Sequence, residues 1–179
     1  MTNHNHYDIE LKNWIDNEKI AANLLNLIGQ LMYDKGIEIV LFRQNILDVG
    51  VTELMRLLSY AENVIERKIE LETALILAQE ITDMELPPSK LDLGLLTAEF
   101  HEDNSTNHRL FLETKLQKVL NSNSNFSPRD VVLFGFGRIG RLAARELIRQ
   151  AGKGQQMRLK AIVVRNITDE QIMKRANLL

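Results

Sequence analysis

Cysteine is absent from the 179 residues, and proline (3 residues) and aromatic residues (6%) are scarce. Without Cys, these residues hold no disulfide scaffold, no Cys-ligated zinc or iron–sulfur site and no thiol nucleophile. No apolar run approaches the roughly 18 residues that a membrane-spanning helix needs, and the first residues lack the pattern of a signal peptide. We therefore expect a cytoplasmic protein with no membrane partner. The 45% of hydrophobic residues is enough to bury a core.

Charge is distributed unevenly around the formal net value of −2. Residues 1–129 carry −8 and residues 130–179 carry +6, and the two parts meet at a polar, turn-prone stretch, 121–129. We interpret 1–120 as one domain, 121–129 as a linker and 130–179 as the start of a second domain.

The basic tail raises the hypothesis of nucleic-acid binding, with Arg141, Arg145 and Arg149 forming an i,i+4 row. A solvated helix face with Glu146 nearby explains the same row, so we expect no nucleic-acid partner.

Helical spacing of apolar residues dominates the first domain. It predicts helices over 11–32, 51–63, 70–84, from Ser89 to Phe100, and over 108–120. The segment 37–42 is β-prone and is interpreted as an extended connector or a short strand. The fold expected here is an α-helical bundle of about five helices.

The pattern of the second domain predicts a strand over 131–134, a helix over 138–150 and a second strand over 159–164. Thr168 and Gln171 then form a capping box that opens another helix. Two parallel strands cannot bury both faces of a doubly wound sheet, so we expect an incomplete α/β Rossmann domain that exposes apolar sheet surface and tends to associate.

Gly135, Gly137 and Gly140 match the pattern G-x-G-x-x-G between the first strand and its helix. In a dinucleotide-binding fold, the first glycine permits a tight turn, the second lets the backbone approach a pyrophosphate and the third lets helix and strand pack closely. The helix N-terminus is then an anion site, to which Arg138 adds a charge.

The heptapeptide Gly135–Arg141, followed by the strand that leads to Asn166, resembles the start of the NAD-binding domain of phosphorylating glyceraldehyde-3-phosphate dehydrogenase. The segment Pro87–Gly94 resembles the N-terminal extension of a long bacterial form of that enzyme. The resemblance implies an oxidoreductase that uses NAD or NADP, and a homo-oligomer, a tetramer in that family. The residues so assigned to the cofactor are Gly135, Phe136, Gly137, Arg138, Ile139, Gly140, Arg165 and Asn166.

Two positions depart from the family pattern. Phe134 stands where an Asn usually precedes the first glycine, and Asn166 stands where a carboxylate binds the adenosine ribose in NAD-preferring members. Loss of the carboxylate removes repulsion toward a 2′-phosphate, and Arg165 offers it a partner, so the choice between NAD and NADP stays open.

The resemblance also implies a catalytic Cys and His far downstream, and none of the four His here is assigned that role or a metal site. We expect the sequence to be an N-terminal part of a longer enzyme, with catalytic residues beyond Leu179. The alternative function is a helical interaction or regulatory module, residues 1–120, with a vestigial nucleotide-binding tail.

Overall fold

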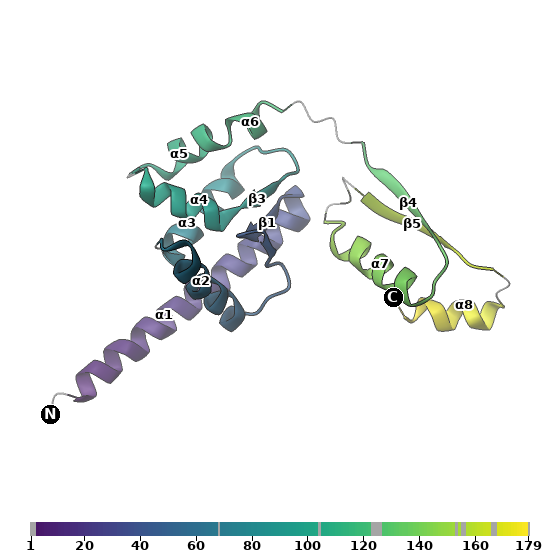
Figure 1. Cartoon of the computed structure of the whole chain (residues 1–179), viewed down its shortest axis with the longest axis horizontal. Helices are drawn as coiled ribbons and strands as arrows, with labels where there is room; N and C mark the ends of the chain where they lie inside the picture. Colours follow the sequence, from purple (N-terminus) through teal and green to yellow (C-terminus); the bar gives the residue numbers. More distant parts are fainter. Residues whose placement is uncertain are drawn as a thin grey trace. The chain divides into compact units, whose positions relative to one another are not determined.

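The computed structural model describes residues 3–67, 69–103, 105–122, 127–152, 154, 157–165 and 168–178. The chain forms two compact units, residues 1–122 (unit 1) and 123–179 (unit 2), which Figure 1 shows in purple to teal and in green to yellow. The elements of both units are coloured in chain order.

Unit 1 is rich in helix. Its helices are α1 (Asn3–Gln30), continued by a π-helical turn η1 (Leu31–Lys35), α2 (Val51–Ile65), α3 (Leu71–Asp83), α4 (Leu93–Glu102), α5 (His108–Lys115) and α6 (Gln117–Leu120). The helices expected over 11–32, 51–63 and 70–84 are confirmed. The helix expected over 108–120 is divided, because Leu116 leaves the helical region between α5 and α6.

The core of unit 1 lies around α3. This helix packs against α1, α4 and α5, and its residues Leu77, Ala78 and Ile81 are fully buried. The facing side of α1 buries the apolar residues expected from their spacing, with Leu24 and Ile28 almost fully buried. The amphipathic pattern of the sequence therefore predicts which helix faces form this core.

Unit 1 is not purely helical, in contrast to the expected bundle. It holds a three-stranded sheet in the order β2-β1-β3, made of β1 (Glu38–Leu41), β2 (Gln44–Asn45) and β3 (Lys90–Asp92). β1 pairs parallel with β3 and antiparallel with β2. β3 is too short to show a period of its own, so its pairing across some fifty residues is decided by tertiary structure.

Asp92 ties this sheet to α4. Its carboxylate accepts hydrogen bonds from the backbone N–H groups of Phe42 (2.9 Å), Arg43 (3.0 Å) and Leu95 (3.2 Å). It is thus the N-cap of α4 and also holds a β1–β2 turn whose two residues have positive φ. The helix expected to begin near Ser89 begins at Leu93, because the preceding residues are taken into β3.

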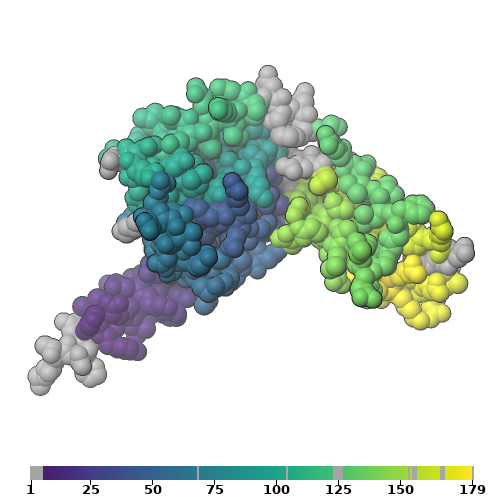
Figure 2. Space-filling model, in the orientation of Figure 1, coloured from purple at the N-terminus to yellow at the C-terminus, as the bar shows by residue number. Residues whose placement is uncertain are grey.

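The N-terminal half of α1 extends beyond the other elements of unit 1 (Figures 1 and 2). Its apolar residues keep helical spacing but are exposed, and Trp14 is 58% exposed. They continue the stripe that is buried further along the same helix. The exposed members of this stripe, called the α1 stripe, are Tyr7, Leu11, Trp14 and Ile15.

Unit 2 is a β–α–β unit followed by a helix, and these four expected elements are confirmed. They are β4 (Arg129–Phe134), α7 (Arg138–Arg149), β5 (Met157–Val163) and α8 (Asp169–Ala176). β4 and β5 are parallel neighbours, with a register shift that leaves Lys160 as an extra residue on β5. The Thr168 hydroxyl accepts a hydrogen bond from the N–H of Gln171 (3.4 Å) and caps α8.

The β4–β5 sheet exposes apolar side chains. α7 packs on the sheet and buries Ala144 completely. On β4, Val132 and Phe134 are exposed, Phe134 to 74%, and on β5 Val163, the register partner of Phe134, is also exposed. The expected exposure of apolar sheet surface is confirmed, and the expected association stays a prediction.

Candidate functional site

The turn from β4 to α7 consists of Gly135, Phe136 and Gly137. Gly135 has φ +105°, a conformation that residues with a Cβ rarely adopt. Its N–H donates a hydrogen bond to the carbonyl of Val163 (2.7 Å), so the sheet pairing continues into the turn. Glycine at 135 is therefore explained by the conformation of the backbone.

Close packing explains why position 140 is a glycine. A Cβ at this position would lie within 3.0 Å of the Gly135 carbonyl oxygen, a separation that Cβ atoms essentially never show. The first turn of α7 thus rests directly on the backbone of the glycine turn. This is the role that the sequence pattern assigns to the third glycine.

Neither backbone conformation nor close packing explains why position 137 is a glycine. It is the N-cap of α7, with φ −78° and ψ −161°, an extended conformation open to any residue. A Cβ added here would meet no protein atom within 4 Å. The chain itself therefore does not require glycine at 137, and the space beside its backbone is free for a ligand.

The start of α7 offers unused hydrogen-bond donors. The first N–H with an acceptor inside the helix is that of Arg141, which bonds to the Gly137 carbonyl (3.1 Å). The N–H groups of Arg138, Ile139 and Gly140 precede it and have no carbonyl four residues back in the helix. Gly137 has no side chain with which to cap them. The positive end of the helix dipole adds to the attraction for an anion.

Two hollows adjoin this turn. The first, called the helix-start hollow, has a volume of about 500 Å³, and its lining includes Gly137, Arg138, Ile139 and Gly140. The second, called the β5-end hollow, has a volume of about 370 Å³. It is lined by Phe134, Gly135, Phe136, Gly137, Val163, Val164, Arg165 and Arg175. Among the residues that the structure describes, no carboxylate lines either hollow, so both favour a negatively charged group.

The residues expected from the sequence to bind a cofactor differ in their surroundings. Phe136 is only 9% exposed and anchors the turn, whereas Ile139 is 83% exposed at the start of α7. Arg165 follows the end of β5 and shares the β5-end hollow with the glycines. Asn166, expected at the ribose, lies outside the described residues.

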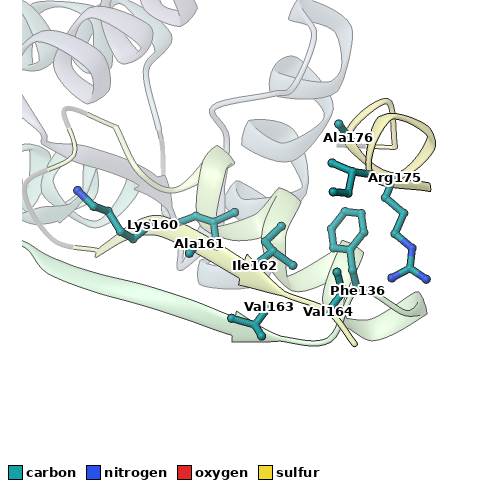
Figure 3. Close-up of a pocket in the computed structure, with 10 residues that line it drawn as sticks. Phe136, Lys160, Ala161, Ile162, Val163, Val164, Arg175 and Ala176 are labelled. Atoms are coloured by element: carbon teal, nitrogen blue, oxygen red, sulfur yellow. The ribbon is translucent and has the colours of Figure 1, made fainter. Parts of the chain in front are cut away.

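Arg175 was not expected at this site. It lies on α8 and is half-buried, and Figure 3 shows it beside Phe136 and Val164 at the end of β5. It lines the β5-end hollow and also a larger hollow of about 680 Å³ along β5. The sequence places it in the last turn of a capped helix, but only the path of the chain after β5 brings it to the turn.

Three other arginines of unit 2 have partners within the unit. Arg158 pairs with Asp130 (2.7 Å), Arg145 donates to the Leu178 carbonyl (2.7 Å), and Arg149 pairs with Glu146 (2.7 Å). The hydrogen bond from Arg149 lowers the pKa of the Glu146 carboxyl below its usual value. These contacts support the reading of the α7 arginine row as a solvated helix face.

The histidines whose side chains are described lie in unit 1. His6 is near Glu10, His101 is 3.8 Å from a Glu70 oxygen, and His108 stacks on Phe100. The structure, for the residues it describes, brings no three His, Asp or Glu side chains together as a metal site. Across the same ranges, no helix has the length and hydropathy needed to span a bilayer.

These features define a helix-rich region joined to a partial α/β unit with a glycine-rich turn. No protein-family model matches the chain. A "glyceraldehyde-3-phosphate dehydrogenase-like protein" from Pseudomonas aeruginosa is 34% identical to it over 162 residues. The match covers 87% of this chain and 35% of the relative, so the chain spans about a third of the relative's length and the similarity extends well into unit 1.

Proposed function

We propose that the glycine turn of unit 2 binds the diphosphate of NAD or NADP, as the first β–α–β unit of a Rossmann-type domain in a dehydrogenase related to glyceraldehyde-3-phosphate dehydrogenase. The observation that carries this proposal is Gly137. Its backbone conformation and its free surroundings do not call for glycine, whereas a phosphate approaching the start of α7 does.

The described residues fit a diphosphate. The N–H groups of Arg138, Ile139 and Gly140 donate to phosphate oxygens, and the Arg138 guanidinium, which lines the helix-start hollow, adds a full positive charge. Gly135 contributes no donor, since its N–H is used by Val163. The cofactor, when bound, supplies hydride transfer, and the residues named here bind and orient it.

The activity of a whole enzyme is a further part of the proposal. The resemblance over Gly135–Arg141 and the name of the Pseudomonas relative both favour an oxidoreductase that acts on an aldehyde. The thiol nucleophile of that reaction is not among these 179 residues, which contain no Cys. We assign to this chain the binding of the cofactor and no step of the chemistry.

An NMR titration of the ¹⁵N-labelled chain with NADH tests the binding site. We expect the amide signals of Gly137, Arg138, Ile139 and Gly140 to shift, with millimolar affinity because two strands provide only part of a dinucleotide site. Signals from the α1 stripe serve as an internal control and should not move. No shift at the glycine turn at 10-fold the expected millimolar concentration would contradict the proposal, as would shifts confined to unit 1.

The exposed α1 stripe favours a second function, the docking of unit 1 on another amphipathic helix. Trp14 is the single tryptophan of the chain, so its emission reports directly on this surface. If a second copy docks here, we expect the emission to move to shorter wavelength as the chain concentration rises, and Leu11→Ser to suppress the shift. Tyr60→Ser, which alters an exposed residue of α2, is the matched control. Emission that stays typical of exposed Trp in associated chains contradicts this function.

A further inference from the structure

We propose that Arg165 and Arg175 bind a phosphate on the adenosine ribose, so that this site prefers NADP(H) over NAD(H). The inference rests on the proposed function, because it places a second phosphate beside the diphosphate at the glycine turn. It assigns a role in the choice between NAD and NADP to Arg175, a residue that lies outside the glycine pattern.

The two arginines and the glycine turn share one cavity. The lining of the β5-end hollow includes Gly135 and Gly137 of the turn and also Arg165 and Arg175. β4 and β5 are parallel, so their carboxyl ends lie at the same edge of the sheet. In dinucleotide-binding folds the ribose hydroxyls next to adenine are recognised at the end of the second strand, which here leads directly into Arg165.

The charge of the hollow favours an added phosphate. Among the described residues no Asp or Glu lines it, so none of them would accept the ribose hydroxyls as a carboxylate does or repel a 2′-phosphate. The acidic residues nearest in sequence to Arg175 are Asp169 and Glu170 at the start of α8, and Glu170 pairs with Lys174 (2.8 Å). The described lining of the site therefore offers two positive charges and no competing carboxylate.

Among the described residues, Arg175 has no side-chain partner, in contrast to three other arginines of unit 2. Arg145, Arg149 and Arg158 each hold a carbonyl or a carboxylate. Within the described ranges, no ion pair or side-chain hydrogen bond engages the Arg175 guanidinium. A half-buried guanidinium with unsatisfied donors that lines a hollow is suited to bind a phosphate through two parallel hydrogen bonds.

Partial burial also restricts the conformation of the Arg175 side chain before a ligand binds. Its side chain runs beside Phe136, which is nearly buried, and Val164 (Figure 3). A side chain held in place loses less conformational entropy on binding than a free one. Arg165 is exposed, so we expect Arg175 to contribute more to the preference than Arg165.

The test compares the affinities of the full chain for NADPH and NADH by the same NMR titration. We expect NADPH to bind about tenfold more tightly, the effect of one charge-assisted hydrogen-bonded pair. Arg175→Gln should bring the two affinities together, because it weakens NADPH binding far more than NADH binding. Lys174→Gln removes the same charge from the neighbouring residue of α8, which lines neither hollow, and should keep the tenfold preference.

The inference would be overturned if the unaltered chain bound NADPH and NADH with equal affinity, or if the preference for NADPH survived Arg175→Gln. In either case, NADH binding at the glycine turn would still support the proposed function. An equal loss of preference in Lys174→Gln would also overturn it, because the effect would then be one of net charge. Absence of binding by either dinucleotide would overturn the proposed function and this inference together. The same comparison can be made with the adenosine half of the cofactor alone, by titrating adenosine 2′,5′-bisphosphate and adenosine 5′-monophosphate. Equal affinities for these two compounds would contradict the role of Arg175 in binding the 2′-phosphate.

Discussion

Gly137→Val is expected to abolish the binding of NADH, with a loss of at least about 100-fold, and to leave unit 2 folded. The loss follows because the new side chain fills the space beside the first donors of α7, where a phosphate must come within hydrogen-bond distance. The fold persists because position 137 has φ −78° and a Cβ there meets no protein atom within 4 Å. The measurement is the NMR titration, with the dispersion of the unit 2 signals as the check on folding.

Gly50→Val is the matched control for this variant. Gly50 is likewise a glycine N-cap with extended backbone, φ −84° and ψ 168°, and has the same free space around it, but it begins α2 in unit 1. Both variants carry the same small cost of a β-branched N-cap. NADH affinity should be lost in Gly137→Val and kept in Gly50→Val. If Gly137→Val bound NADH with the same affinity as the unaltered chain, the proposed binding site would be wrong.

Gly140→Ala is expected to destabilise unit 2 by about 3 kcal/mol, in the upper range for an overpacked position. The added methyl group would press on the carbonyl of Gly135, a backbone atom that is itself held through the Gly135–Val163 hydrogen bond. The first turn of α7 would have to move away from the glycine turn. Binding of NADH should fall as a result of this movement, so Gly140→Ala and Gly137→Val separate the structural glycine from the functional one.

Amide hydrogen exchange in β4 and β5 measures this effect. Fluorescence is unsuitable, because Trp14 and the three tyrosines all lie in unit 1. Exchange in the two strands should accelerate by about two orders of magnitude, while exchange in α3 should not change. Gly29→Ala is the control, since Gly29 lies inside α1 with free space around it, and alanine there should stabilise that helix slightly. Unchanged protection of β4 and β5 in Gly140→Ala would show that α7 does not rest on the turn as described.

Local pattern was sufficient to predict unit 2. β4 is a short apolar run, α7 follows a glycine motif, and Thr168 caps α8 with its hydroxyl. Each of these signals acts within a few residues, so the structure of the rest of the chain does not alter it. The positions of Gly135 and Gly140 also followed from the motif, because its spacing reflects the geometry of a strand-to-helix turn.

The small sheet of unit 1 was predicted less well. β2 and β3 have two and three residues, and such strands gain their stability from a partner distant in the sequence. The conformation of Phe42 and Arg43 depends likewise on the carboxylate of Asp92, some fifty residues away. No local pattern carries that information.

By itself, the sequence determined the helices of unit 1, the β–α–β order of unit 2 and the glycine turn, since all of these depend on periodicity, caps and backbone freedom within short segments. The tertiary structure decided which side chains meet at that turn. Arg175 reaches the β5-end hollow only because α8 returns along β5, and Gly137 stands out only when the space around it is known. Both depend on the positions in space of atoms that belong to different elements, and a pattern of residues along one chain does not specify those positions.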